Sequence, residues 1–180
     1  MTSKTPETSL NLRSYISLGL IAGTVILLDQ LTKSWVRTHL ALGQTWMPWE
    51  PLAPYARIVH WQNSGAAFGM FQNAGGLFAI LAVLVAAMII YYFPRLGPQD
   101  WAVRLAMSLQ LGGALGNLID RLQHGYVTDF ISVSTFPIWN IADASITCGV
   151  IVLILDVVWF NRGRQDTAST PVQGDDRASR

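Results

Sequence analysis

Residues 116–146 read GNLIDRLQHGYVTDFISVSTFPIWNIADASI and place several ionisable side chains between apolar segments. One apolar segment runs from Leu105 to Ile119, and the other runs from Ala144 to Leu155. Carboxylates next to segments that can lie in lipid are energetically costly, so they indicate a functional site. The polar residues of this stretch include Asp120, Asp129, Asp143, Arg121, Asn117 and Asn140.

The composition of the whole chain is typical of a membrane protein. Of its 180 residues, 51% are hydrophobic and only 13% are charged, whereas soluble domains carry about 25% charged residues. The formal net charge of +1 gives no basis for binding nucleic acid, which requires clustered basic residues. The single cysteine, Cys148, excludes an intrachain disulfide and a multi-cysteine metal site, and we expect it to be buried in an apolar helix.

Four long apolar segments predict four transmembrane helices in a single membrane domain that covers residues 1–180. The segment from Gly75 to Phe93 has 19 residues without a charge, which suits a membrane span. In the third segment, Gly112 and Gly116 have the spacing that lets a neighbouring helix approach closely. The expected helices cover about residues 15–35, 75–93, 101–119 and 138–160, followed by a disordered tail over residues 161–180.

The segment of residues 37–74 differs in kind from the spans. Prolines at positions 48, 51 and 54 interrupt any helix, and ARIVHWQNSGAAFGMF has strand-like alternation before a glycine-rich turn. Its aromatic residues suit the membrane surface, and the pattern equally fits a packed subdomain outside the membrane. The predicted fold class is therefore an all-α polytopic membrane protein with a small β-like, amphipathic periplasmic subdomain between the first two helices.

The distribution of Lys and Arg predicts the orientation of the chain. Eight of these residues lie at the two ends and in the 94–104 turn, and four lie on the opposite side. Because positive residues concentrate on the cytoplasmic side, we expect both termini in the cytoplasm. The acids at positions 29, 120, 129 and 143 then all lie at one level, near the outer membrane surface.

Two other classes of protein also place acids in membranes. A transporter or proton-conducting subunit would distribute its acids across the depth of the bilayer, so the single level argues against it. A lipid-binding membrane protein without enzymatic activity is a second alternative.

Asp29 and Lys33 are four residues apart on the first predicted helix, with the acid before the base. This spacing places them on one helix face and favours an ion pair. The pair has two interpretations: it pins the helix end at the interface, or it supports the site formed by the other aspartates.

The residue types near the aspartates favour acid–base chemistry. There is no Ser/His/Asp signature, and His39, His60 and His124 have no metal-ligand spacing. Two carboxylates held close together cannot both ionise cheaply, so one of them retains a proton. Such a pair can deprotonate a water molecule and protonate a peptide carbonyl, which hydrolyses an amide without a covalent intermediate. We therefore expect no metal and no other cofactor.

Four motifs resemble those of the lipoprotein signal peptidases, also called signal peptidase II. GNLIDRLQHGYVTDF and NIADASI resemble the paired signature of that family. Upstream, DQLTK (Asp29 to Lys33) and NSGAAF (Asn63 to Phe68) are similar to its other two motifs. The resemblance covers about residues 20–160, in the family's order. One departure is Trp139, where the family often has phenylalanine.

The resemblance implies a multi-pass aspartic endopeptidase of the bacterial inner membrane, with its active site near the periplasmic surface. Members of the family remove the signal peptide from diacylglyceryl-modified prolipoproteins and cleave on the N-terminal side of the lipid-modified cysteine. By the resemblance, Asp129 and Asp143 are the catalytic pair. The residues that match its substrate-binding or supporting positions are Asp29, Lys33, Asn63, Gly65, Asn117, Asp120, Arg121 and Asn140.

The expected partners follow from the same resemblance. They are diacylglyceryl prolipoprotein substrates and membrane lipid, without nucleic acid. We expect the protein to act as a monomer.

Overall fold

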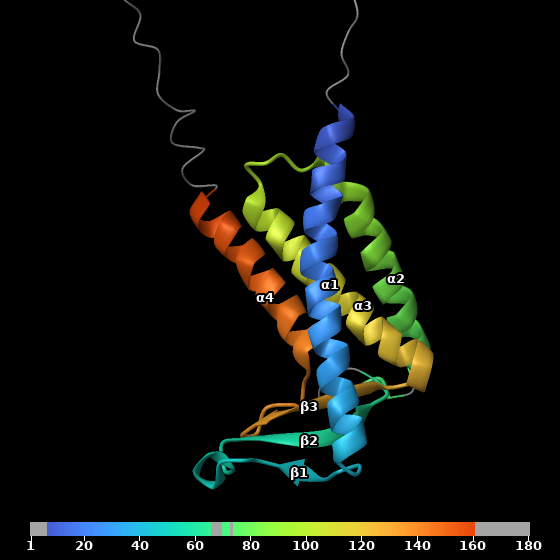
Figure 1. Cartoon of the computed structure of the whole chain (residues 1–180), viewed down its shortest axis with the longest axis vertical. Helices are drawn as coiled ribbons and strands as arrows, with labels where there is room; N and C mark the ends of the chain where they lie inside the picture. The colour runs from blue at the N-terminus through green and yellow to red at the C-terminus, as the bar shows by residue number, and fades with distance from the viewer. Residues whose placement is uncertain (1–6, 66–69, 73, 161–180) are drawn as a thin grey trace, which may run out of the picture.

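The computed structural model describes residues 7–65, 70–72 and 74–160 of the chain. Within them, a helical bundle carries a small antiparallel sheet at one end (Figure 1). The helices are α1 (Glu7–His39), α2 (Gly75–Tyr92), α3 (Trp101–His124) and α4 (Ile141–Leu155), which continues as a π-helical turn, η4 (Asp156–Phe160). The strands are β1 (Thr45–Trp46), β2 (Ala56–Asn63) and β3 (Val127–Val133), and short 3-10 turns are η1 (Glu50–Leu52) and η3 (Phe93–Arg95).

Among the described residues, three helical segments are long and apolar enough to cross a membrane. They are Tyr15–His39, Gly75–Arg95 and Ile141–Val158. Their surfaces carry large exposed apolar side chains such as Leu27 and Ile80. Apolar patches of this extent are unusual on proteins surrounded by water, so they suit helices surrounded by lipid.

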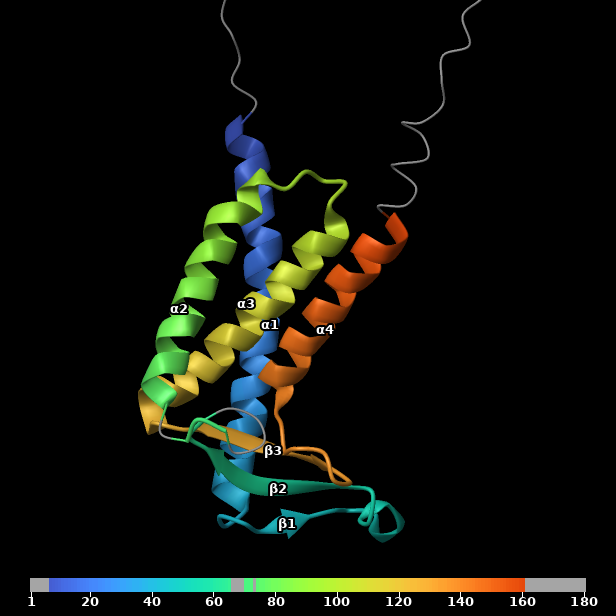
Figure 2. The same cartoon turned by 180° about the vertical axis from the view of Figure 1, so that it is seen from behind.

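The third predicted span, α3, is a helix of a different character. It packs against α1, α2 and α4 and occupies the middle of the bundle (Figure 2). Its buried residues include the polar side chains of Ser108, Asn117 and Asp120, which lowers its apolar character. All four predicted helices are therefore present in the described part of the chain, and three of them have the length and composition of a span.

Glycines on α3 allow its two neighbours to approach closely, as predicted. A methyl group on Gly112 would lie 2.7 Å from Val25 Cβ on α1, and one on Gly116 would lie 2.7 Å from Asp29 Oδ2. A methyl group on Gly113 would overlap the carbonyl oxygen of Ala142 on α4. Side chains larger than hydrogen at these positions would push the three helices apart.

Several predicted helix boundaries are wrong. The first helix begins at Glu7 and ends at His39, beyond both limits of the predicted 15–35. The third continues to His124 because Gly125, in the left-handed region (φ +79°), is the residue that ends it. The fourth begins only at Ile141, because the extended backbone of Asn140 makes that residue its N-cap.

The predicted small β-like subdomain is present as a three-stranded antiparallel sheet in the order β1-β2-β3, so the protein is mostly helical and not all-α. The strand-like alternation of residues 56–63 is confirmed as β2. The strand β3 lies between α3 and α4, in a segment for which the sequence predicted only a connection. It pairs antiparallel to β2, with Trp61 opposite Asp129, so the sheet is built from segments on both sides of α2 and α3.

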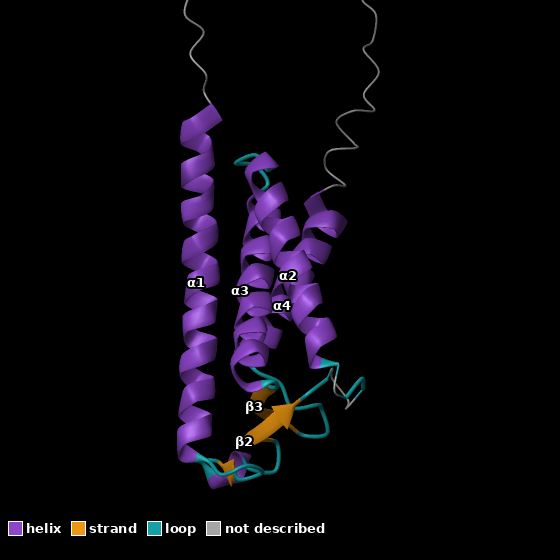
Figure 3. Cartoon of the chain, turned by 90° about the vertical axis from the view of Figure 1, so that its right-hand side faces the viewer, coloured by secondary structure: helices purple, strands orange, loops and turns teal. Residues whose placement is uncertain are grey.

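A small apolar cluster attaches the sheet to the bundle. Val36 and Leu40, near the end of α1, pack with Phe130 of β3. Figure 3 shows the sheet at the end of the bundle where α1 finishes and α4 begins. A second cluster joins α1, α2 and α3, and its buried residues are Leu18, Ala22, Ala86, Ile89, Phe93 and Leu111. The predicted disordered tail lies outside the described residues.

Candidate active site

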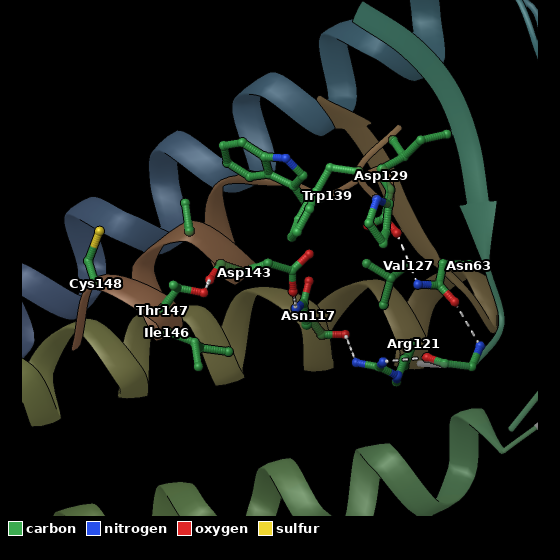
Figure 4. A pocket seen from close by; sticks show the side chains of 15 residues that line it. Asn63, Asn117, Arg121, Val127, Asp129, Trp139, Asp143, Ile146, Thr147 and Cys148 are labelled. Carbon is green, nitrogen blue, oxygen red and sulfur yellow. Dashed lines mark hydrogen bonds between the residues drawn. The ribbon is translucent and has the colours of Figure 1, made fainter. Parts of the chain in front are cut away.

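Asp129 and Asp143 come from different elements and line one cavity. Asp129 lies on β3 and is only 2% exposed, and Asp143 lies in the first turn of α4. The cavity has a volume of about 530 Å³, which falls in the usual range for a small-ligand site. The cavity extends from Arg121, on α3, to Cys148, on α4 (Figure 4).

A short backbone pairing brings the start of α4 next to β3. The N–H of Trp139 donates to the carbonyl of Ile131 (3.1 Å), and the N–H of Ile131 donates to the carbonyl of Trp139 (2.8 Å). The next residue, Asn140, is thereby held beside the strand that carries Asp129. The side chain of Trp139 itself forms part of the cavity wall.

Asn140 links the two aspartates. Its side-chain N–H donates to Asp129 Oδ1 at 2.7 Å, and its backbone N–H donates to Asp143 Oδ2 at 3.3 Å. Its side-chain oxygen accepts from the backbone N–H of Asp143 at 3.0 Å, which completes a capping box at the start of α4. Asn140 is fully buried, so a single residue both begins the helix and holds the two carboxylates.

Two further asparagines donate to the remaining carboxylate oxygens. Asn63, from β2, donates to Asp129 Oδ2 at 3.0 Å. Asn117, from α3, donates to Asp143 Oδ1 at 2.7 Å. Both amides point at their carboxylates across the cavity wall (Figure 4). Each carboxylate oxygen of the pair therefore has one N–H donor.

Burial makes Asp129 a weaker acid than an aspartate exposed to water. Removal from water, with the nearby charge of Asp143 as the second cause, raises its pKa from the ordinary value of 3.8 to about 7. The hydrogen bonds from Asn63 and Asn140 act in the opposite direction because they stabilise the ionised form. At neutral pH, Asp129 is therefore the carboxyl of the pair that can hold a proton.

Behind the pair lies a fully buried ionic cluster. Lys33 Nζ lies 2.8 Å from Asp29 Oδ2 and 3.3 Å from Asp120 Oδ2, and all three side chains are 0% exposed. Lys33 also donates to Asn117 Oδ1 at 2.9 Å. The ion pair at positions 29 and 33 is thus deep inside the protein and in contact with the asparagine that binds Asp143, and it is not a surface pair at a helix end.

Gly65 and Arg121 close one end of the cavity. The Gly65 N–H donates to Asn63 Oδ1 at 3.0 Å, and its carbonyl accepts a long hydrogen bond, 3.4 Å, from Arg121. Arg121 also donates to the backbone carbonyl of Asn117, again at 3.4 Å, while its buried Nε has no partner within the described residues. All ten residues that the sequence singled out therefore lie in the cavity wall or in the hydrogen-bonded network behind it.

Sequence reasoning missed three polar residues of this network. Gln30 donates to Asp29, to the Gly116 carbonyl and to Asp120, and Arg37 donates to Asp120 and Thr128. Gln30 lies inside the DQLTK motif, so the motif itself was a signal. Arg37 is four residues after Lys33, on the same helix face, which was a second signal. Thr128 lies inside the motif GNLIDRLQHGYVTDF, which was a signal of the same kind, but its contact with Arg37 depends on the strand β3.

The prediction for Cys148 is wrong, because this residue is exposed and lines the cavity. It lies with Thr147 and Ile146 on the part of α4 that leads away from Asp143. The wall of the cavity is consequently polar around the aspartates and largely apolar along α4 and over residues 136–139. Such a site suits a substrate with one polar group to be processed and a long apolar part.

The arrangement of the aspartates argues against a proton relay across the bilayer. All four aspartates near the sheet belong to one connected network, whereas a proton relay across the bilayer would need acids at several depths. Within the described residues, no group of three or more His, Cys, Asp or Glu side chains is arranged to hold a metal ion.

Comparison with known proteins identifies the family. Residues 21–159 match the family model described as signal peptidase (SPase) II. A lipoprotein signal peptidase of Moorella thermoacetica is 40% identical over 134 residues, which are 74% of this chain and 87% of that protein. One from Teredinibacter turnerae is 42% identical over 144 residues, 76% of this chain and 83% of that protein.

Solved structures agree with the sequence comparison. A bacterial membrane enzyme determined by the in meso method matches with a TM-score of 0.73 and 30% sequence identity, over 91% of this chain and 94% of that one. A second such structure matches with a TM-score of 0.71 and 33% identity, over 79% and 93% of the two chains. From its sequence and its fold, this chain belongs to the signal peptidase II family of membrane proteases, the lipoprotein signal peptidases.

Proposed function

We propose that this chain is an aspartic endopeptidase that removes the signal peptide from diacylglyceryl-modified prolipoproteins, with Asp129 and Asp143 as its catalytic pair. The observation that carries the proposal is the shared cavity of the two carboxylates and their link through Asn140. Membership of the lipoprotein signal peptidase family supports the substrate class. Cleavage occurs on the N-terminal side of the lipid-modified cysteine.

The two aspartates take different roles. Asp129, whose pKa burial raises to about 7, carries the proton and donates it to the carbonyl oxygen of the scissile peptide. Asp143 is less buried and accepts hydrogen bonds from Asn117 and from the backbone of Asn140, so it is the ionised general base. A pair with one proton between two carboxylates is the form that can act as acid and base together.

Hydrolysis then proceeds in two balanced steps. In the first, Asp143 takes a proton from water while the water oxygen bonds to the carbonyl carbon, and Asp129 protonates the carbonyl oxygen. In the second, Asp143 gives its proton to the amide nitrogen, the carbon–nitrogen bond breaks, and Asp129 recovers a proton from a hydroxyl of the intermediate. The products are a carboxylic acid and an amine, and the pair returns to its starting protonation state.

The apolar part of the cavity supports an entry route from the membrane. Along α4 the wall leads from Asp143 past Ile146 to Cys148, and the adjacent helix surface is exposed and apolar. We propose that the diacylglyceryl chains stay against this surface while the peptide bond reaches the carboxylates. The apolar signal helix would keep the substrate oriented, which reduces the entropic cost of the reaction.

The proposed topology has four spans in the bacterial inner membrane. α3 crosses within the bundle, both termini lie in the cytoplasm, and the sheet lies at the periplasmic surface. The eight-to-four distribution of Lys and Arg supports this orientation. We propose that the active unit is a monomer, because the chain itself supplies an N–H donor to each carboxylate oxygen of Asp129 and Asp143, so the pair is complete without a residue of a second copy.

The test is cleavage of a synthetic prolipoprotein peptide by the purified protein. The peptide carries diacylglycerol on its cysteine, and mass spectrometry should detect a product that begins with that cysteine. A peptide with an unmodified cysteine serves as the substrate control. Failure to cleave the diacylated peptide in lipid or detergent would reject the proposal.

Substitution of the pair tests the mechanism. Asp129→Asn and Asp143→Asn should each reduce turnover to background, and the double variant should be no worse, because the two residues act as a unit. Asp156→Asn is a matched control, since Asp156 lies at the other end of α4, about 20 Å along the helix. Substantial turnover by either single variant would remove that aspartate from the mechanism.

A further inference from the structure

The residue before each catalytic aspartate donates its backbone N–H to a buried aspartate outside the pair, and the buried aspartate differs in the two cases. Thr128, immediately before Asp129, donates its N–H to Asp120 Oδ2 at 2.8 Å. Ala142, immediately before Asp143, donates its N–H to Asp29 Oδ1 at 3.0 Å. The two arrangements use different helices for support, α3 for the strand and α1 for the start of α4.

A single ammonium group joins these two supports. Lys33 Nζ contacts Asp29 Oδ2 (2.8 Å) and Asp120 Oδ2 (3.3 Å). The backbone before each catalytic aspartate is thus tied to one central cation through one carboxylate. Charge-assisted hydrogen bonds of this kind are about twice as strong as neutral ones, and the cluster is fully buried, so water does not compete for them.

The same ammonium determines how the Asn117 amide is turned. An ammonium has only donors, so the Asn117 atom at 2.9 Å from Lys33 Nζ must be the oxygen. The amide nitrogen then faces Asp143, to which it donates at 2.7 Å. With the amide reversed, its oxygen would face the ionised Asp143 and repel it.

We propose that Lys33 is a positioning residue that sets the separation and orientation of the Asp129 and Asp143 carboxylates through Asp29, Asp120 and Asn117. The proposal rests on the proposed function, because it assigns Lys33 a role only in a reaction that uses this pair. It also assigns the buried Asp29–Lys33 ion pair of α1 a role in catalysis, in place of fixing the end of the helix at the membrane interface. A loss of about 1 Å of precision in a catalytic pair costs about 100-fold in rate.

The test removes the ammonium without leaving a buried charge unbalanced. Together with the partly exposed Arg37 next to it, the buried cluster holds two cations, Lys33 and Arg37, and two anions, Asp29 and Asp120. The double variant Lys33→Met with Asp29→Asn leaves the Arg37–Asp120 pair intact, which avoids an uncompensated buried carboxylate. With diacylated peptide as substrate, kcat should fall about 100-fold while KM stays within about threefold, since the cavity wall that binds the substrate is unchanged.

The pH profile separates positioning from simple loss of folded enzyme. The charges that act on Asp129 include Asp143, which raises its pKa, and Lys33, which lowers it. The double variant removes the Lys33 charge that lowers the pKa of Asp129. The alkaline limb of kcat/KM should therefore move to higher pH in the double variant, whereas a smaller folded fraction would lower the rate equally at every pH.

A second variant and a control complete the design. Lys33→Gln with Asp29→Asn is also charge-balanced and retains an N–H donor for Asn117, so its kcat should exceed that of the Met variant at least about threefold. Arg104→Met is the control, because Arg104 also joins α3 to α1, through Ser17 Oγ at 3.3 Å, but at the opposite end of the bundle. Arg104→Met should keep the kcat and the alkaline limb of the unmodified protein.

Two results would overturn the proposal, and they are distinguishable. Turnover by Asp129→Asn would reject the proposed catalytic role of the Asp129–Asp143 pair, and the positioning role of Lys33 would be rejected with it. Inactive Asp129→Asn, together with wild-type kcat and an unmoved alkaline limb in either double variant, would overturn only the positioning role. A reduced kcat with a displaced limb in the double variants, absent from Arg104→Met, supports it.

Discussion

The side-chain amide of Asn140 lies 2.7 Å from Asp129 Oδ1, although Asn140 is the N-cap of the helix that carries the other aspartate of the pair. The residue that begins α4 therefore also sets the position of Asp129 on β3. This double role can be separated, because the cap uses the side-chain oxygen and the link uses the side-chain nitrogen.

Asn140→Ser should reduce turnover strongly while preserving stability. Serine is as good an N-cap as asparagine, but its hydroxyl is too short to reach Asp129. Asn140→Ala should lose turnover and also about 1 kcal/mol of stability from the missing cap. The measurements are turnover of the diacylated peptide and the melting temperature in detergent. Wild-type turnover by Asn140→Ser would show that the link to Asp129 has no role in catalysis.

The pH dependence of kcat/KM should show an alkaline limb near pH 7. The active form needs a proton on Asp129, whose pKa is raised to about 7, so activity is present below that value and is lost as pH rises through it. Asn63→Ala removes an N–H that stabilises the ionised carboxylate and should move the limb to higher pH. Gln62→Ala, an exposed neighbour on the same strand, is the control. A limb that stays in place or moves to lower pH in Asn63→Ala would contradict the assignment.

Gly113→Ala should destabilise the protein and lower its turnover of the diacylated peptide. The added methyl group would overlap the carbonyl oxygen of Ala142, next to Asp143, and overpacking of this kind costs about 1–3 kcal/mol. Gly23→Ala on α1 is the matched control, because a methyl group there meets no atom within 4 Å. Its melting temperature should be unchanged or higher, since alanine favours helix over glycine. Equal melting temperatures for Gly113→Ala and the unmodified protein would mean that α4 can move away from the added methyl group without a loss of stability.

Cleavage should survive treatment with EDTA. The oxygens of Asp129 accept hydrogen bonds from Asn63 and Asn140, and the oxygens of Asp143 accept them from Asn117 and from the backbone of Asn140. One N–H donor on each oxygen leaves a single free lone pair per oxygen, and in the described part of the chain no group of three or more His, Cys, Asp or Glu side chains is arranged to hold a metal ion. The measurement is turnover before and after chelation. Loss of activity that zinc or another divalent ion restores would make the aspartates metal ligands.

A topology reporter should place the two ends of the bundle on opposite sides of the membrane. Fused after Arg180, or inserted between Arg95 and Asp100, it should report the cytoplasm; inserted near Pro54, it should report the periplasm. The physical basis is the excess of Lys and Arg on the cytoplasmic side. A periplasmic signal from the fusion after Arg180 would reverse the orientation and place the catalytic pair on the cytoplasmic face.

The local pattern of the sequence determined much of this protein. The membrane class and the positions of the helices follow from runs of apolar residues, because a helix in lipid satisfies its backbone hydrogen bonds within itself. The close approach at Gly112 and Gly116 follows from the spacing of two small residues. The gathering of the aspartates at one end followed from connecting the spans alternately up and down.

Tertiary structure alone decided how the site is assembled. The strand β3 exists because β2, more than 60 residues earlier in the chain, offers it a partner, and a strand cannot satisfy its backbone groups by itself. The contact between Asp29 and the N–H of Ala142 joins residues 113 positions apart. Periodicity predicts which residues are buried along one element. It carries no information on which donor from another element will meet a buried carboxylate. Those meetings give Lys33 its central position, and the packing of separate elements around Asp129 raises the pKa of that carboxyl.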